Sequence, residues 1–293
     1  MRWRSAGETA GPRTARLAIA VGVLLTMMGA QAVMADAVSI GTSDPLGPFL
    51  VDDAGRTLYL FLGDSPGRST CEGGCIEQWP IVHFERLEPS TDLDARLFHE
   101  IERADGRLQS TYLGWPLYRF SGDGEPGEAR GHGLGNQWFV VDPFDLDPLV
   151  ADWMLVELTD ARTGETFRVS DFYGTPVLLE SFAVWCSVCL RQQREMAELL
   201  DSDGDAVVHV SLDTDPNEDV EAVRDHAAKH GFDWWFAVAP IEMTQRLIDA
   251  FGLTVVNAPR APVVLIDVDG AARLLPAGVK GSDDLRAAVE AGA

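Results

Sequence analysis

The cysteine pair in "ESFAVWCSVCLRQQREM" (180–196) is the sequence feature that most limits how this chain can fold. Cys186 follows a continuous apolar run, which predicts a buried strand, and it begins a segment with helical spacing. Free backbone N–H groups and the helix dipole favour a thiolate at the start of a helix. Cys189 lies one turn further along, close enough to Cys186 for a disulfide bond.

The second half of the chain alternates short apolar runs with helical ones, which predicts an α/β fold around a central sheet. The predicted strands cover 154–158, 176–183 and 206–212, and a hairpin covers 261–276. The predicted helices cover 186–200, 217–232 (ending near Gly231), 241–252 and 282–292. Ser282 is the expected N-cap of the last helix.

The first half contains an internal repeat, in which Gly55–Trp79 aligns without a gap onto Gly114–Trp138. In each copy a tyrosine and a phenylalanine two residues apart share one face of a strand, and Gly-Asp then forms a turn. Each unit should therefore be a strand, a turn, a Gly-rich loop and a Trp-bearing strand. We expect residues 37–145 to form one β-rich domain with approximate internal symmetry.

This pattern, in "LYLFLGD" and "LYRFSGD…GNQWFVV", resembles a family of secreted repeats with a Tyr-x-Phe-x-x-Asp motif. The resemblance implies a fold and an exported location more than a reaction. Cys71 and Cys75 align with Arg130 and Leu134 of the second copy, so the repeat scaffold does not need them. The oxidising context favours a local disulfide, either structural or active in a second redox step.

The first 35 residues have the pattern of a secretory signal peptide: a basic start, a short apolar run and small residues suited to cleavage. We expect cleavage near Ala32 or Ala35. The apolar run is too short to span a bilayer comfortably, so no stable transmembrane segment is expected after cleavage; an uncleaved anchor is the lesser alternative. A Pro- and Asp-rich stretch, 146–152, is the expected linker to a second domain at 153–293.

Charge and cysteine content exclude several classes of function. The formal net charge of −23 argues against nucleic-acid binding, because phosphate would be repelled. The four cysteines form two close pairs, and close pairs remove little entropy from the unfolded chain. Stapling of the fold is therefore a weak explanation for either pair.

The segment "FAVWCSVC" resembles the Trp-Cys-x-x-Cys signature of the thioredoxin superfamily, in its exported branch that includes cytochrome-maturation proteins. The resemblance implies that Cys186 attacks and Cys189 resolves, directly after Trp185 of the signature. It also implies that Pro262 is the cis-proline facing the disulfide, and that Glu180 is the buried carboxylate of the superfamily.

These features together predict an exported thiol–disulfide oxidoreductase with protein thiols or disulfides as partners, among them an electron-donating membrane protein. No cofactor is expected. The alternative is an extracytoplasmic binding protein whose cysteine pairs bind copper or are only structural disulfides. Further metal ligands at suitable spacing are missing after Cys189, which disfavours the copper interpretation.

Overall fold

The computed structural model describes residues 36–145 and 149–291. The expected signal peptide with its cleavage sites at Ala32 and Ala35, and residues 146–148 of the expected linker, lie outside the described residues. Within the described ranges, no helix is both long enough and apolar enough to cross a membrane.

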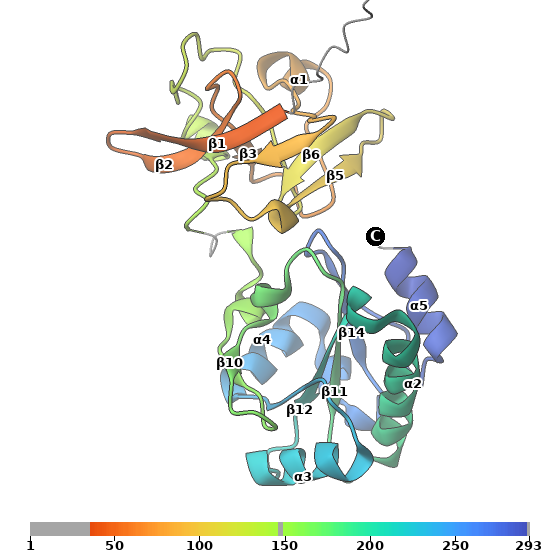
Figure 1. Ribbon diagram of the computed structural model, residues 1–293. Coiled ribbons are helices and arrows are strands. Elements are labelled where there is room, and N and C mark those ends of the chain that lie inside the picture. The colour runs from red at the N-terminus through yellow and green to blue at the C-terminus, as the bar shows by residue number, and fades with distance from the viewer. Residues whose placement is uncertain (1–35, 146–148, 292–293) are drawn as a thin grey trace, which may run out of the picture. The chain divides into compact units, whose positions relative to one another are not determined.

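The first half is rich in short strands, as the repeat predicts, and is drawn from red to yellow-green in Figure 1. Strands β2, β1 and β4 form one sheet, β5, β6 and β7 form another, and β3 pairs with β8. The elements are β1 Asp36–Ser43, β2 Gly47–Asp52, β3 Tyr59–Phe61, α1 Gly74–Gln78, β4 Leu87–Pro89, η1 Ala95–Leu97, β5 Phe98–Glu102, β6 Leu108–Tyr112, β7 Trp115–Pro116, η2 Leu134–Asn136 and β8 Trp138–Val140.

The two repeats hold each other through exchanged tyrosine–aspartate hydrogen bonds. Tyr59 of the first copy donates to Asp123 of the second at 2.6 Å, and Tyr118 of the second donates to Asp64 of the first at 2.6 Å. The two tyrosines also exchange backbone hydrogen bonds with each other. Each copy therefore completes the polar contacts of the other, which explains why the motif occurs twice in one domain.

The two repeats differ from the expected order at two points. Tyr118 and Phe120 of the second copy lie outside the named strands, and Tyr118 makes only isolated bridges. Trp138 begins strand β8, as predicted, but Trp79 caps the short helix α1 and is not in a strand. The two indole rings nevertheless stack at 3.8 Å, parallel within 1°. The stacked pair explains the recurrence of tryptophan better than a shared strand does.

The second half is an α/β domain around a five-stranded sheet of order β13-β12-β11-β14-β15. Strands β11, β12 and β13 are parallel to one another, β14 is antiparallel to β11, and β15 is antiparallel to β14. The elements are η4 Asp152–Leu155, β9 Leu158–Thr159, β10 Thr166–Phe167, η5 Val169–Phe172, β11 Val177–Phe182, α2 Ser187–Asp203, η6 Gly204–Ala206, β12 Val208–Asp213, α3 Val220–His230, β13 Trp235–Val238, α4 Ile241–Phe251, η7 Leu253–Val256, η8 Ala258–Arg260, β14 Val263–Ile266, β15 Ala272–Leu274 and α5 Ser282–Glu290.

Helices cover both faces of this sheet, so the central strand β11 is buried along its whole length. Alternate side chains of a strand point to opposite faces. Leu178 accordingly packs with Leu285 of α5, and Leu179 packs with Leu247 of α4. The continuous apolar run before Cys186 is explained by this double burial.

Three local expectations in the second half are wrong. The predicted strand 154–158 is a strand only at Leu158, which begins β9; Met154 and Leu155 belong to the helical turn η4, which buries Met154 without sheet pairing. Helix α5 has Gly281 at the N-cap position, so Ser282 is its first residue and does not cap it. The sheet also contains β13, a strand that the sequence analysis did not predict.

The exchanged hydrogen bonds of the repeats predict unequal effects of two matched substitutions. Tyr118→Phe should lower the free energy of unfolding by about 1–3 kcal/mol, because it removes one of the hydrogen bonds of the buried Asp64 carboxyl and one of the Ser69 hydroxyl. Tyr59→Phe should cost less, because Asp123 is less buried than Asp64.

Urea denaturation of the full chain measures both effects. Tyr112→Phe is the control, since the phenol of this buried tyrosine makes no side-chain hydrogen bond within the described residues. Equal losses for all three variants would show that the exchanged hydrogen bonds add nothing to the cost of removing a hydroxyl.

Candidate active site

Cys186 lies where the buried strand β11 passes into helix α2. Strand β11 ends at Phe182, and Cys186 is the N-cap residue of α2. Its sulfur accepts a hydrogen bond from the backbone N–H of Cys189 at 3.1 Å. This N–H group and the helix dipole both stabilise negative charge on the Cys186 sulfur when the pair is reduced.

The two cysteines form a disulfide with Cα atoms 5.3 Å apart, so the expected pairing is present in the structure. Cys186 lines an open hollow of about 460 Å³ together with Trp185, Ser187, Leu190, His226 and other residues. The Cys189 sulfur lies 3.2 Å from the carbonyl oxygen of Ala258, beneath the η8 turn. Cys186 is 3% exposed and Cys189 1%, and the hollow lies on the side from which a partner sulfur would reach Cys186.

Trp185 extends into solvent beside the disulfide, with 63% of its surface exposed. Its indole N–H donates to Asp215 at 2.6 Å, and this bond holds the pKa of the Asp215 carboxyl below its usual value. Glu218 accepts the backbone N–H of Val184 at 2.7 Å. The loop that follows β12 thus fixes the backbone just before Cys186.

This loop contains an acidic group that the sequence analysis did not predict. Asp213, at the end of β12, is fully buried, and burial with the nearby charge of Glu218 raises its pKa to about 7. The signal in the sequence was the acidic stretch after the strand, "SLDTDPNED". Two other carboxylates of this stretch, those of Glu218 and Asp215, accept hydrogen bonds from the backbone of Val184 and the indole of Trp185, just before Cys186.

Glu180 is buried in the centre of β11, with 1% of its surface exposed, so the expected buried carboxyl is found. Burial raises its pKa to about 7, although the Ser211 hydroxyl, the Gln193 amide and the charge of Lys280 oppose this rise. The Ser211 hydroxyl donates to Glu180 at 2.7 Å from the neighbouring strand β12. A carboxyl with this pKa can exchange a proton near neutral pH.

Lys280 is a second buried charge in this region that sequence reasoning missed. Burial lowers its pKa to about 8, while the charge of Glu180 acts in the opposite direction. Its ammonium group donates to the carbonyl of Ala261, and its backbone N–H donates to Gln192 of α2 at 2.8 Å. A single lysine far along the chain from Glu180 gives no sequence signal for this proximity.

The expected cis conformation at Pro262 is wrong. Across the described residues, the one cis peptide bond joins Asp44 and Pro45. Ala261 adopts the left-handed conformation (φ 46°) and makes the turn from η8 into β14 without a cis bond. Pro262 is buried and its carbonyl accepts from Ser181, whereas Pro259 lines the hollow next to Trp185.

Cys71 and Cys75 also form a disulfide, with Cα atoms 5.5 Å apart, as the sequence analysis expected for a local pair. Cys71 is buried among the repeat aromatics, and Cys75 is in α1. Within the parts of the chain that the structure describes, no three His, Cys, Asp or Glu side chains are grouped as a metal site would require.

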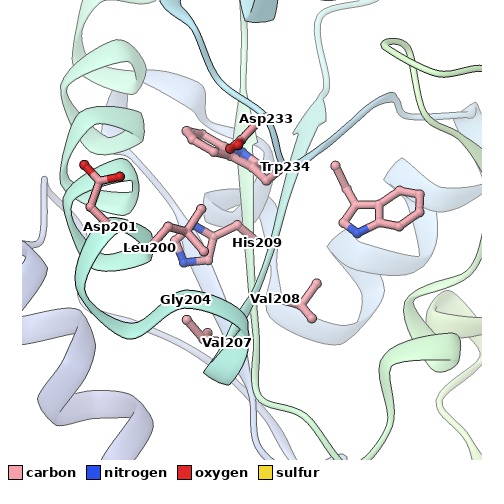
Figure 2. A pocket seen from close by; sticks show the side chains of 9 residues that line it. Leu200, Asp201, Gly204, Val207, Val208, His209, Asp233 and Trp234 are labelled. Atoms are coloured by element: carbon pink, nitrogen blue, oxygen red, sulfur yellow. The ribbon is translucent and has the colours of Figure 1, made fainter.

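A separate hollow of about 390 Å³ lies at the other end of β12, around His209 (Figure 2). Figure 2 shows the imidazole among Leu200, Asp201 and Trp234. Burial lowers the pKa of His209 to about 4, so the ring is neutral at physiological pH. This hollow contains no cysteine and does not contribute to the disulfide site.

Comparison with protein families assigns each half of the chain. Residues 149–278 match the family described as Redoxin. The C-terminal half is a redoxin domain. Residues 42–83 and 100–142 match the family described as a secreted repeat of unknown function, which confirms the resemblance of the first half. The redoxin domain with its Cys-x-x-Cys disulfide is a thioredoxin-like oxidoreductase.

Several solved structures are similar to about half of the chain. A secreted Mycobacterium tuberculosis disulfide oxidoreductase, homologous to E. coli DsbE, is 20% identical and covers 48% of this chain and 98% of its own, with a TM-score of 0.37. DsbF of the same bacterium is 16% identical over 49% and 99%, with a TM-score of 0.40.

The exposed lipoprotein thioredoxin Etrx1 of Streptococcus pneumoniae is 25% identical and covers 46% of this chain and 98% of its own, with a TM-score of 0.36. No curated protein sequence shows significant similarity to the chain.

The raised pKa of Glu180 predicts a pH-dependent effect of Glu180→Gln on stability. Between about pH 4.5 and about 7 the folded state keeps the Glu180 proton that the unfolded state releases, so stability falls as pH rises through this window. The variant lacks this penalty. Its free energy of unfolding relative to wild type should therefore rise by about 3 kcal/mol across the window.

Urea denaturation at a series of pH values measures this difference. Glu198→Gln, at an exposed glutamate of α2, is the matched control and should give a flat difference. A flat difference for Glu180→Gln as well would contradict a raised pKa at this residue.

Proposed function

We propose that this protein is an exported thiol–disulfide oxidoreductase that exchanges disulfides with protein partners through Cys186 and Cys189. The observation that carries the proposal is the asymmetry of the pair. Cys186 lines an open hollow at the start of α2, and the sulfur of Cys189 lies under the carbonyl of Ala258. The secreted-repeat match of the first half supports the exported location.

The first step is attack by the reduced pair on a partner disulfide. The Cys186 thiolate, stabilised by the backbone N–H of Cys189, attacks one partner sulfur. A mixed disulfide forms between Cys186 and the partner, the partner disulfide breaks, and its other sulfur leaves as a thiolate that takes a proton from water.

The second step resolves this mixed disulfide. The Cys189 thiol loses its proton and attacks the Cys186 sulfur, which forms the Cys186–Cys189 disulfide and releases the partner as a dithiol. We assign Glu180 as the base that accepts the Cys189 proton. Its raised pKa, caused by burial, fits a proton acceptor that works near neutrality. The same steps in reverse oxidise a partner dithiol.

Trp185 and Pro262 have positioning roles in this proposal. The exposed indole of Trp185, fixed by its bond to Asp215, borders the hollow where a partner segment would lie beside Cys186. Pro262 receives the hydrogen bond from the Ser181 N–H and so aligns β14 with the end of β11.

The assignment of attacking and resolving cysteines predicts opposite behaviour of two variants. Cys189→Ser should accumulate a stable mixed disulfide through Cys186 when incubated, after reduction, with a peptide that carries one internal disulfide. Cys186→Ser should accumulate almost none, because the sulfur of Cys189 lies under η8. Mass spectrometry of the intact adduct measures both. Equal adduct in the two variants would contradict the assigned roles.

The base role of Glu180 predicts a kinetic effect on the second step. Glu180→Gln should leave the attack by Cys186 almost unchanged and slow the release of the mixed disulfide by about 10²-fold, since base catalysis commonly contributes at least that much. Single-turnover exchange followed as a function of pH separates the steps, with Glu198→Gln as control. Unchanged release rates and an unchanged pH profile would remove Glu180 from the mechanism.

A further inference from the structure

The two repeats of the first half have the same tyrosine–tryptophan packing, although only one of them contains a disulfide. The tyrosine and tryptophan of each copy meet edge to face, at 5.4 Å for Tyr59 and Trp79 and at 5.2 Å for Tyr118 and Trp138. The second copy has Arg130 and Leu134 where the first has the cysteines, and its aromatic core forms equally well. The fold of the repeat therefore does not require the Cys71–Cys75 bond.

The Cys71–Cys75 disulfide is also a weak constraint on the unfolded chain. The two cysteines are only four positions apart, so the bond closes a short loop and removes little chain entropy. Neither the repeat scaffold nor loop closure explains the presence of this pair. Its chemistry offers a better explanation.

The two sulfurs of this pair differ in access to solvent. Cys71 is buried, with 1% of its surface exposed, and Cys75 is partly exposed on α1. Exchange requires an attacking thiolate to approach one sulfur while the other leaves. Attack at Cys75 is open to a partner, and Cys71 is then the leaving sulfur.

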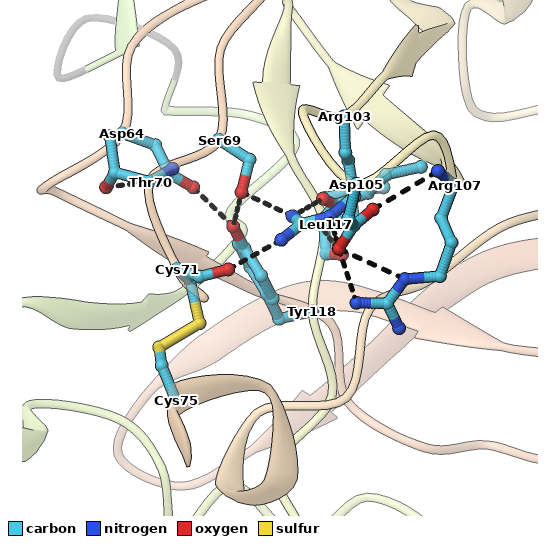
Figure 3. Close-up of polar contacts among 11 residues, drawn as sticks. Asp64, Ser69, Thr70, Cys71, Cys75, Arg103, Asp105, Arg107, Leu117 and Tyr118 are labelled. Carbon is cyan, nitrogen blue, oxygen red and sulfur yellow. Dashed lines mark hydrogen bonds and ion pairs between the residues drawn. A yellow bond between two sulfur atoms is a disulfide. The ribbon is translucent and has the colours of Figure 1, made fainter. Parts of the chain in front are cut away.

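A buried guanidinium, that of Arg103, lies beside the backbone of Cys71, the cysteine whose sulfur would leave (Figure 3). Arg103 is 6% exposed, and it donates to the backbone carbonyl of Cys71 at 2.6 Å and to the Ser69 hydroxyl at 2.5 Å. Its ion pair with Asp105 is long, at 3.6 Å. The guanidinium contacts the carbonyl oxygen of Cys71 and not its sulfur, so its positive charge favours a leaving Cys71 thiolate through space.

A second carboxyl near Arg103 is Asp64, which accepts the hydroxyl of Tyr118 at 2.6 Å (Figure 3). Burial raises the pKa of Asp64, although the charge of Arg103 opposes this rise. Asp64 is also satisfied by the backbone N–H of Thr70 at 2.6 Å. These contacts fix the loop that leads into Cys71 and keep the guanidinium in place.

We propose that Cys71 and Cys75 form a second redox-active pair, which is attacked at Cys75 and accepts two electrons from a dithiol, with the reduced Cys186–Cys189 pair as the donor. A donor thiolate attacks the Cys75 sulfur, the Cys71–Cys75 bond breaks, and Cys71 leaves as a thiolate beside Arg103 and takes a proton from water. The donor's second thiol then releases Cys75 as a thiol, and the donor becomes the disulfide.

The choice of donor rests on the proposed function of the redoxin domain. Both pairs belong to one chain, so the covalent connection sets a high effective concentration of one pair at the other. The redox activity of the second pair itself is independent of that function, because a small dithiol can serve as the donor in a test.

The first test uses the full mature chain with Cys186→Ser and Cys189→Ser, which leaves Cys71 and Cys75 as the remaining cysteines. The folded protein is equilibrated with mixtures of reduced and oxidised dithiothreitol, and thiols are counted by alkylation and mass spectrometry. We expect a reversible gain of two thiols in the folded state. A disulfide that opens only after denaturant is added would overturn the proposal.

Two arginine variants in the same background test the role of Arg103. Arg103→Gln should slow attack by dithiothreitol by about tenfold, because the leaving thiolate loses the nearby positive charge. Arg107→Gln is the matched control, since Arg107 pairs with the same Asp105 at 2.7 Å and makes no contact with Cys71. Circular dichroism verifies that both variants are folded. Equal rates in the two variants would exclude Arg103 as the group that stabilises Cys71.

The donor is tested with Cys189→Ser, in which Cys186 cannot be resolved internally. Peptide mapping should show a bond between Cys186 and Cys75, and not between Cys186 and Cys71. Adducts of Cys186 with added disulfide peptides but none with Cys75 would overturn transfer between the pairs while leaving the function of the redoxin domain intact. Failure of Cys186 to form any adduct would instead contradict the proposed function.

Discussion

The burial of Glu180 in the central strand is the constraint around which the redoxin domain is arranged. Moving a carboxylate out of water costs several kcal/mol unless it is protonated or paired. The domain meets this cost with a hydroxyl from β12, an amide from α2 and the charge of Lys280. Elements far apart in the sequence are therefore tied to one group, which lies six residues before the attacking cysteine.

The first half uses a different solution to a similar problem. Its two aspartates, Asp64 and Asp123, are satisfied by tyrosines of the opposite repeat, and the central tryptophans stack on each other. A single copy would leave a tyrosine hydroxyl without its carboxylate partner and would remove one hydrogen bond from each aspartate, so the pair is more stable than two separate copies. The duplication thus contributes to the stability of this domain.

The parts of the structure that could be predicted from sequence are those in which neighbouring residues carry the signal. The apolar run before Cys186, the two-residue spacing to Cys189 and the lone glutamate in a buried strand are all local, and each was placed correctly. The gapless repeat likewise predicted a β-rich first half. The tyrosine–aspartate hydrogen bonds between the repeats follow once the two copies of the motif lie against each other.

The parts that sequence did not predict depend on the folding of distant segments. Lys280 reaches the region of Glu180 from a loop one hundred residues later along the chain, and no spacing rule connects them. At Pro262 the family resemblance implied a cis bond, whereas the turn is made by the left-handed Ala261. The segment 154–158 has the composition of a strand, but its first two residues belong to a helical turn and only Leu158 pairs in a sheet, because tertiary packing outweighs local propensity.

The reduction potential of Cys186 and Cys189 is the measurement that decides whether they form a reversible dithiol–disulfide couple. The folded chain with Cys71→Ser and Cys75→Ser is equilibrated against dithiothreitol or glutathione buffers, and the indole fluorescence of Trp185 and the thiol count are followed together. We expect one reversible two-electron transition, with about 30 mV per tenfold change in the ratio of reduced to oxidised protein. A pair that stays oxidised until the protein unfolds, or that takes up stoichiometric copper and no electrons, would contradict it.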